Sequence, residues 1–395
     1  MHSAFLRARL LALAAVMCCG AQGCNAADDD ETVESLQNAD ASSDGAYDAR
    51  IEDAPQEPKD VSAVESESGS GDAVADVGLD QGTVDAESGQ DAADAQQEPS
   101  GQDATADVSD AGPSCNGSPL YCDRPYNQVA VACTHNAQSN EEDPGFDLPT
   151  PNQKYSFQHQ LDDGVRCMMI DTYSYQGQPV LCHSYCQLGA TAWVPMLQGV
   201  KSWLEVHPTE VLTFILEAYL SEAETLKALQ DSGIYPLVYH HGAPPGSPWP
   251  SLKWMVEHDQ RLVIFTDDAK ANGDWHLHWP SYGWETPYND PTFTCADARG
   301  DPTAHDNQVF ILNHYTLCST GGCASNGATN NVYSWLFPRA AKCWHPSAQY
   351  NPWAQIPTFV TVDHYEVPQP GEQGPRADVL DAVAALNASW PTPPP

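Results

Sequence analysis

Three short apolar runs near the middle of the chain each stop abruptly at polar side chains. They are residues 129–132 before Thr134, His135 and Asn136, residues 168–170 before Asp171, and residues 179–182 before His183 and Ser184. Runs of this kind are typical of strands buried on both faces of a parallel sheet. Because parallel strands end at one rim of a barrel, the pattern predicts a barrel with polar chemistry at that rim.

The rest of the sequence alternates between strand-like and helix-like segments. The further predicted strands are residues 210–220, 261–266, 308–313 and 357–363, and the predicted helices are residues 192–207, 222–230, 251–258, 331–344 and 377–386. This alternation indicates a parallel sheet covered by helices. Six or seven strands can be counted, so we predict an α/β fold, a TIM-type (β/α)8 barrel with room for irregularity.

The chain is strongly acidic, with 54 Asp and Glu against 16 Lys and Arg and a formal net charge of −38. Proteins that bind nucleic acid place clustered Lys and Arg against the phosphates, so the composition argues against a nucleic-acid partner. It also argues against a polybasic surface for anionic membranes.

Residues 1–24 have the layout of an export signal. Two arginines supply positive charge, and the apolar residues 10–17 are too few to span a bilayer. The segment Ala21-Gln22-Gly23-Cys24 resembles the lipobox of bacterial lipoproteins, in which the cysteine is lipidated. We therefore predict export and a membrane anchor at Cys24, at the cell surface or in the periplasm. The alternative is ordinary signal cleavage, with the protein secreted.

Residues 25–114 form an acidic, low-complexity segment that we predict to be a disordered linker. They contain 25 acidic and two basic side chains and a single aromatic one, Tyr47. Such a segment buries too little apolar surface to offset the chain entropy lost on folding. The composition changes at Cys115, and residues 115–395 have the length expected of one barrel domain.

From Cys115 onwards the chain contains ten cysteines. An even number of cysteines after an export signal favours disulfide bonds over a thiol nucleophile. A zinc site is disfavoured because no pair of Cys-x-x-Cys elements occurs. The connectivity stays open, although Cys182 and Cys186 flank His183 and are expected to fix that loop through a disulfide.

The polar residues at the predicted strand ends suit one kind of chemistry. They are His135, Asn136, Asp171, His183, Glu217, Asn313 and Asp363. Two histidines suit acid–base catalysis near neutral pH. Oxygen donors such as Asn136, Asp171 and Glu217 are the ligands that Ca²⁺ and Mg²⁺ prefer. Phosphodiester cleavage needs a cation beside two histidines, one taking a proton from the nucleophile and one giving a proton to the leaving alcohol.

Four segments, in this order, resemble the X domain of phosphatidylinositol-specific phospholipases C. They are Cys133-Thr134-His135-Asn136, Gly164-Val165-Arg166-Cys167-Met168-Met169-Ile170-Asp171, Leu181-Cys182-His183-Ser184 and Phe214-Ile215-Leu216-Glu217. The resemblance runs from about residue 127 to residue 265, more loosely to Asp363, and points to the exported, PLC-like branch. It implies a phosphoric diester hydrolase that cleaves a phospholipid or a related phosphodiester. We expect a monomer.

The resemblance also assigns roles to individual residues. His135 and His183 would be the acid–base pair, Asp363 would orient His135, and Asn136, Asp171 and Glu217 would hold the cation. Metal-independent members have basic side chains where this chain has Asp171 and Glu217. The chain therefore resembles the metal-dependent kind, with Ca²⁺ favoured over Mg²⁺. Met169 stands where those relatives have a glutamate, which leaves the site one ligand short.

Other interpretations stay open. A glycerophosphodiesterase or a sphingomyelinase-D-like lyase could use the same barrel, but those families place a glutamate and an aspartate where this chain has Met169 and Asp171. A non-catalytic surface lipoprotein with a degenerate site would explain Met169 but not the retained histidines. Asp171 and Glu217 could also form ion pairs with Arg166 or Arg261 instead of holding a metal.

Substrate selection is the feature that the sequence shows least. No cluster of basic side chains suited to an inositol headgroup is evident. Residues 272–288, rich in Trp and Tyr, follow a predicted strand and should lie over the rim. They either pack on the barrel or contact lipid headgroups.

Overall fold

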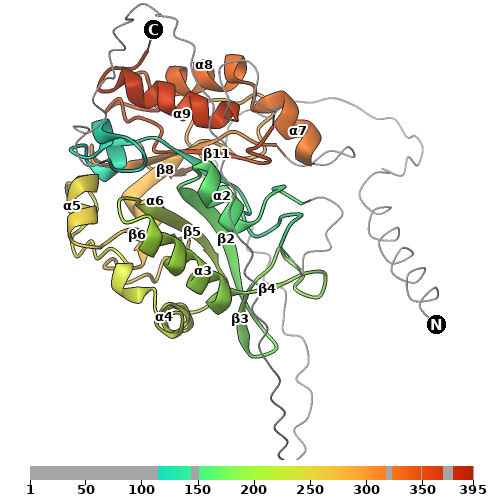
Figure 1. Ribbon diagram of the computed structural model, residues 1–395. Helices are drawn as coiled ribbons and strands as arrows, with labels where there is room; N and C mark the ends of the chain where they lie inside the picture. Colours follow the sequence, from blue (N-terminus) through green and yellow to red (C-terminus); the bar gives the residue numbers. More distant parts are fainter. Residues whose placement is uncertain (1–113, 144–150, 317–322, 348, 368–376, 395) are drawn as a thin grey trace, which may run out of the picture. The chain divides into compact units, whose positions relative to one another are not determined.

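The computed structural model describes residues 114–143, 151–316, 323–347, 349–367 and 377–394 (Figure 1). The predicted signal peptide, Cys24 and residues 25–113 of the predicted linker lie outside these ranges. Within them, no helix has both the length and the apolar character needed to cross a membrane.

Eight parallel strands form the barrel wall. In the order in which they pair, they are β7 (Leu277–His278), β6 (Leu262–Thr266), β5 (Leu212–Ala218), β2 (Cys167–Tyr175), β1 (Val131–Thr134), β11 (Phe359–Val362), β10 (Val309–Asn313) and β8 (Gly283–Glu285). Each neighbouring pair on this path is parallel. Among the described residues no hydrogen-bond ladder joins β7 to β8, so the barrel is open there. The prediction of an irregular (β/α)8 barrel is confirmed.

Helices follow most of the strands and cover the outside of the sheet (Figure 1). They are α2 (Phe157–Asp163), α3 (Trp193–Val206), α4 (Glu222–Asp231), α5 (Leu252–Glu257), α6 (Trp279–Tyr282), α7 (Cys323–Asn330), α8 (Tyr333–Trp344) and α9 (Asp378–Ser389), with the short 3-10 helices η2 (Pro119–Tyr121), η3 (Tyr126–Gln128) and η4 (Tyr235–Leu237). Local sequence explains where several helices begin. Ser156, Ser221 and Ser251 accept hydrogen bonds from the first turns of α2, α4 and α5, which satisfies backbone N–H groups that lack a helical partner.

Alternation along the strands decides which side chains enter the barrel. On β5, Leu216 packs outward against the helices, whereas Ile215 belongs to the inner core. Because successive strand residues point to opposite faces, Glu217 shares the inner face with Ile215. The same alternation puts Asp171 on the inner face of β2, two residues after Met169, which packs against the inner core. Asp171 and Glu217 are register partners, so their side chains meet at the rim.

The third apolar run, residues 179–182, does not form a parallel barrel strand, so that prediction is wrong. It falls largely in β3 (Gln178–Leu181), which pairs antiparallel with the far end of β2. Gln176 and Gly177 form the turn, both with positive φ, as tight two-residue hairpins require. A parallel connection needs about a dozen residues or more. The hairpin leaves the rim and returns to it, because Leu181 pairs with Thr172.

Two further antiparallel strands extend the sheet. β4 (Thr191–Ala192) pairs with β3, and β9 (Arg299–Gly300) pairs with β8. Four disulfides join eight of the cysteines: Cys115–Cys122, Cys133–Cys167, Cys182–Cys186 and Cys295–Cys343. The expected Cys182–Cys186 bond is therefore present. Cys318 lies outside the described residues.

His314 follows β10 and is fully buried between two hydrogen bonds. Its Nδ1 accepts a hydrogen bond from Arg339 Nη1 (2.9 Å), and its Nε2 donates one to the carbonyl oxygen of Asn330 (2.7 Å). Burial, reinforced by the charge of Arg339, lowers the pKa of His314 to about 3. The side chain therefore stays neutral in the folded protein at all but strongly acidic pH.

His314 is expected to make the fold less stable in acid. Below an ordinary histidine pKa of about 6.5 the unfolded chain binds a proton that the folded chain does not. As the pH is lowered from there, the free energy of unfolding therefore falls by about 1.4 kcal/mol for each pH unit. This loss continues until the pH nears the folded pKa. Urea unfolding at several pH values should show a shallower pH dependence for His314→Gln than for the unchanged chain. Equal slopes would contradict a buried, neutral His314.

Candidate active site

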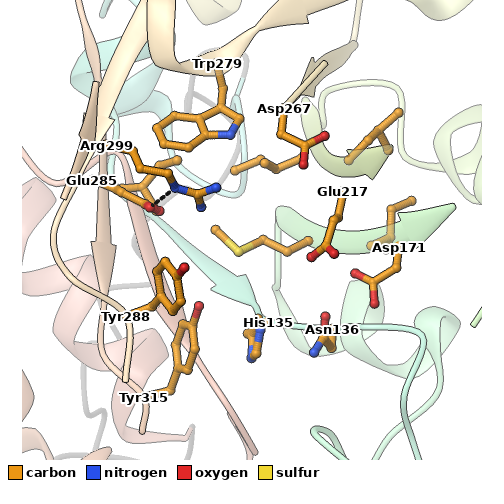
Figure 2. Close-up of a pocket in the computed structure, with 15 residues that line it drawn as sticks. His135, Asn136, Asp171, Glu217, Asp267, Trp279, Glu285, Tyr288, Arg299 and Tyr315 are labelled. Carbon is orange, nitrogen blue, oxygen red and sulfur yellow. Dashed lines mark hydrogen bonds and ion pairs between the residues drawn. The ribbon is translucent and has the colours of Figure 1, made fainter. Parts of the chain in front are cut away.

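Residues at the carboxyl ends of the strands, most of them facing inward, surround a cavity of about 290 Å³ (Figure 2). It is lined by His135, Asn136, Met169, Ile170, Asp171, Ile215, Leu216, Glu217, Asp267, Trp279, Glu285, Tyr288, Arg299, Ile311 and Tyr315. Four of the six predicted site residues are in this lining. The other two, His183 and Asp363, are each within hydrogen-bonding distance of a lining residue.

His135 is held by three neighbours. Its Nδ1 lies 2.9 Å from Oδ1 of Asp363, a buried carboxylate that follows β11. Asn152 Nδ2 donates a hydrogen bond to the same oxygen (3.1 Å). The Tyr315 ring stacks on the imidazole, with centroids 4.0 Å apart and planes inclined by 13°. When Nδ1 donates its proton to Asp363, Nε2 carries the lone pair that can accept another.

His183 reaches the same place from the β2–β3 hairpin. Its Nε2 lies 3.4 Å from Asn136 Nδ2, and the Cys182–Cys186 disulfide closes the loop that carries it. Asn136 has a positive φ of 47°, which turns the chain directly after His135. Burial, together with the nearby His135, lowers the pKa of His183, and two carboxylates partly oppose this shift. The fold thus brings both predicted histidines next to Asn136.

Three carboxylates, Asp171, Glu217 and Asp267, form what we call the acidic edge. Asp171 lies midway along β2, Glu217 lies near the end of β5, and Asp267 directly follows β6. Burial raises the pKa of Asp171 well above its usual value, and the charges of Glu217 and Asp267 add to the rise. The pKa of Asp267 is also raised, chiefly because its carboxylate loses hydration. Crowded carboxylates of this kind are stabilised when a cation binds between them.

The arginines considered as alternative partners of the acidic edge are engaged elsewhere. Arg166 Nε bonds Glu210 Oε2 (2.7 Å), and Arg261 Nε bonds Asp259 Oδ1 (2.8 Å). Glu217 instead accepts a hydrogen bond from the hydroxyl of Tyr219 (2.5 Å). Within the described residues, the acidic edge therefore forms no ion pair with either arginine.

The residues predicted to bind a metal fit a divalent cation by their donor chemistry. Asn136, Asp171 and Glu217 combine two carboxylates with an amide oxygen, which suits Ca²⁺ or Mg²⁺. In the part of the chain that the structure describes, no three His, Cys, Asp or Glu side chains are arranged to hold a metal by themselves. Met169 lines the cavity near these residues, but a thioether is a poor ligand for hard cations. Water would have to complete the coordination shell.

Sequence reasoning missed the opposite wall of the cavity. Glu285, on β8, is buried and bonds both Arg299 Nε (2.5 Å) and Asn313 Nδ2 (2.9 Å). Trp279 and Tyr288 lie against the guanidinium of Arg299. These two aromatic residues belong to the Trp- and Tyr-rich region expected over the rim. Trp279 is packed into the core, whereas Tyr288 is half exposed.

Comparison with known proteins identifies the family. The chain matches the family model described as PI-PLC X 1 over residues 121–371. The chain belongs to the PI-PLC X family. The matched range includes all six predicted site residues, from His135 to Asp363, and almost all of the described barrel.

Curated relatives of this PI-PLC X domain come from fungi and plants. It is 31% identical over 214 residues to PI-PLC X domain-containing protein 1 of Arthroderma benhamiae, covering 51% of this chain and 68% of that protein. It is 34% identical over 210 residues to a PI-PLC X domain-containing protein of Arabidopsis thaliana, covering 48% of this chain and 49% of that protein. An uncharacterized secreted protein of Arthroderma benhamiae is 27% identical over 301 residues, and the alignment covers 69% of this chain and 64% of that protein.

A solved structure of Staphylococcus aureus phosphatidylinositol-specific phospholipase C aligns with the PI-PLC X domain at a TM-score of 0.44 and 13% identity. The alignment covers 66% of this chain and 94% of that one. The family is therefore established by the sequence match, and the architecture by the strand order described above.

Proposed function

We propose that this chain is a phosphoric diester hydrolase of the phospholipase C type, acting on a phospholipid or a related phosphodiester. The observation that carries the proposal is the pair His135–Asp363 with His183 close by, beside a cavity edged with carboxylates. Membership of the PI-PLC X family supports it.

In the proposed reaction His135 is the general base. Asp363 fixes its tautomer and stabilises the imidazolium that forms when Nε2 takes a proton from the attacking hydroxyl. His183, in its protonated form, gives a proton to the oxygen of the leaving alcohol as the P–O bond breaks. The lowered pKa of His183 makes this proton easier to transfer, and it also limits the protonated fraction near neutral pH.

Asn136, Asp171 and Glu217 would hold a divalent cation, with Ca²⁺ favoured because it accepts irregular oxygen ligand sets completed by water. When bound, the ion would neutralise charge on the phosphate. The charges that line the cavity explain why a cation would be needed. Among the described residues that line it, four are carboxylates and one is an arginine, so an anionic phosphate would meet net repulsion.

Two alternatives share the barrel. A non-catalytic binding protein is favoured by Met169, which removes a carboxylate from the metal site. A glycerophosphodiesterase or a sphingomyelinase-D-like lyase is less well supported, because the same methionine occupies the place of its acidic ligand. The arrangement of His135, Asp363 and His183 favours catalysis by an acid–base pair over both.

A substrate screen tests the proposal. The purified full chain is incubated with phosphatidylinositol, phosphatidylcholine, phosphatidylethanolamine, glycerophosphodiesters and glycan-linked lipid anchors, each with and without Ca²⁺ or Mg²⁺. We expect at least one substrate to release a phosphorylated headgroup in a cation-dependent reaction. Binding to lipids without any turnover would favour the non-catalytic alternative.

We also propose that the protein is exported, monomeric and anchored through a lipid on Cys24, without a nucleic-acid partner. The signal-like layout of residues 1–24 supports export. The four disulfides also support it, because such bonds persist in oxidising compartments. One relative is named as a secreted protein.

The anchor leads to a direct prediction. In a bacterial host, the full chain should incorporate radiolabelled fatty acid and sediment with membranes, whereas Cys24→Ser should do neither. The reason is that lipidation at the lipobox requires the thiol of that cysteine. Cys318→Ser is a matched control, because it replaces a cysteine outside the signal region. A soluble, unlabelled full chain would leave plain secretion as the interpretation.

A further inference from the structure

Arg299 lies on β9, which pairs with β8 at the opening of the barrel. Its Nε donates a hydrogen bond to Oε1 of the buried Glu285 (2.5 Å). The other oxygen of Glu285 accepts a hydrogen bond from Asn313 Nδ2 (2.9 Å). One edge of the guanidinium is therefore anchored to a carboxylate that the end of β10 holds in place.

Two aromatic rings fix the position of the same guanidinium. Its central carbon lies 4.7 Å from the centroid of the Trp279 ring and 5.4 Å from that of Tyr288. Figure 2 shows the side chain of Arg299 extending from the Glu285 wall into the space that faces the acidic edge. An arginine held in this way loses little conformational freedom on binding a ligand.

Within the described part of the chain, the fold does not use the terminal nitrogens of Arg299 for hydrogen bonds. A guanidinium has five N–H donors, and among the described residues only Nε of Arg299 forms a hydrogen bond. Arg339 shows what a purely structural arginine does in this protein. Its Nε, Nη1 and Nη2 donate to the carbonyl oxygens of Phe293, Asn313 and Thr294. If Arg299 only neutralised Glu285, a similar use of its terminal nitrogens would be expected.

The charges around the cavity make this arginine distinctive. Arg299 is the single Lys or Arg among the described residues that line the cavity, and its side chain is 49% exposed. Anionic oxygens of a ligand therefore find one cationic side chain in the lining to which they can bind directly. A planar guanidinium with two unused terminal nitrogens matches the paired oxygens of a phosphate group.

We propose that Arg299 binds phosphoryl oxygens of the ligand that occupies this cavity. The inference rests on the proposed function, since it takes the ligand to be a phosphate ester. The phosphoryl group is either the phosphodiester that is cleaved or a separate phosphate monoester on the headgroup. The two sources share the same recognition chemistry, and the experiment below separates them.

The test is calorimetric titration of the purified full chain with dimethyl phosphate, which represents the diester, and methyl phosphate, which represents the monoester. Titrations are run with Ca²⁺ and repeated with chelator. Arg299→Met is expected to weaken binding by about 10- to 100-fold, the usual effect of losing a charge-assisted bidentate contact. Arg299→Lys keeps the charge without the planar fork and should give an intermediate loss. It also serves as the second variant if Arg299→Met fails to fold.

Lys270→Met is the matched control, because Lys270 is exposed after β6 and is not part of the cavity lining. Lys270→Met should bind both probes as tightly as the unchanged chain does, which separates direct contact from the general effect of one lost charge. Loss of dimethyl phosphate binding in Arg299→Met assigns the residue to the cleaved diester, and loss of methyl phosphate binding alone assigns it to a headgroup phosphate. Unchanged affinity for both probes, or no binding of either to the unchanged chain, would overturn the proposal.

This experiment involves no turnover, so its result is independent of the proposed activity. A chain that cleaves no phosphodiester but binds phosphate through Arg299 would reject the proposed function and keep this inference. If Arg299→Met instead cleaves the substrate as well as the unchanged chain does, and binds both probes with unchanged affinity, the proposed function stands and this inference fails.

Discussion

Replacing His135 or His183 with alanine is expected to lower kcat by about 10²- to 10⁴-fold, the usual contribution of a positioned acid or base. His135→Ala removes the group that accepts a proton through Nε2, and His183→Ala removes the group that gives one to the leaving alcohol. The side chain of His135 is 25% exposed at the rim, and His183 is only partly buried. The core packing should therefore survive both substitutions. Initial rates on the best substrate from the screen, with thermal unfolding as a check of the fold, measure the effect.

His258→Ala is the matched control for these variants. His258 is exposed at the end of α5, where its ring stacks on Trp254 and its Nδ1 contacts the carbonyl oxygen of the same residue. The kcat of His258→Ala should equal that of the unchanged chain. Asp363→Asn should also lower kcat, because an amide cannot stabilise the imidazolium of His135 as a carboxylate does. Normal turnover by His135→Ala would remove that histidine from the mechanism.

Removing divalent cations is expected to abolish most of the activity, and Ca²⁺ in the millimolar range should restore it, an order of magnitude typical of weak extracellular sites. The acidic edge explains the direction of this effect. Burial and the charges of Glu217 and Asp267 raise the pKa of Asp171, and without a cation these charges also repel the phosphate. With a cation bound, Asp171 and Glu217 would become its ligands. Initial rates during a Ca²⁺ titration of chelated protein give the measurement.

Substitutions in the predicted metal site sharpen this test. Calorimetric Ca²⁺ affinity should fall in Asp171→Asn and Glu217→Gln. It should rise by roughly tenfold or more in Met169→Glu, because affinity follows the number of charged ligands. Glu205→Gln is the matched control, since it removes an equal charge from the exposed face of α3. Full activity after exhaustive chelation, with Asp171→Asn and Glu217→Gln both harmless, would show that these carboxylates are not a metal site.

The sequence predicts the part of the site that lies on regular strands. His135, Asp171, Glu217 and Asp363 follow apolar runs, and alternation along the strands turns each of them inward. Asp267 follows the strand β6 by the same rule and could have been found in the same way. Strand direction was harder to infer. Residues 179–182 have the composition of a barrel strand, and the short Gln176-Gly177 turn was the signal that they form a hairpin.

The opposite wall of the cavity leaves no such trace in the sequence. Arg299 lies on a two-residue strand after an irregular connection, and its place depends on long-range pairing of β9 with β8. Tyr315 and Asn152 approach His135 from separate loops. Periodicity describes a side chain only relative to its own element, so it cannot show which loop residues meet across a barrel.

Identification of the cleaved bond is the measurement that tests the central claim most directly. Phosphorus NMR of the reaction in ¹⁸O-labelled water shows over time whether the phosphorus leaves with the headgroup or stays on the lipid. We expect cleavage between the glycerol oxygen and phosphorus, which yields diacylglycerol and a phosphorylated or cyclic-phosphate headgroup. In His135→Ala this cleavage should slow by about 100-fold or more. Release of a headgroup without phosphorus, leaving phosphate on the lipid, would contradict the account, as would product formation at an unchanged rate in His135→Ala.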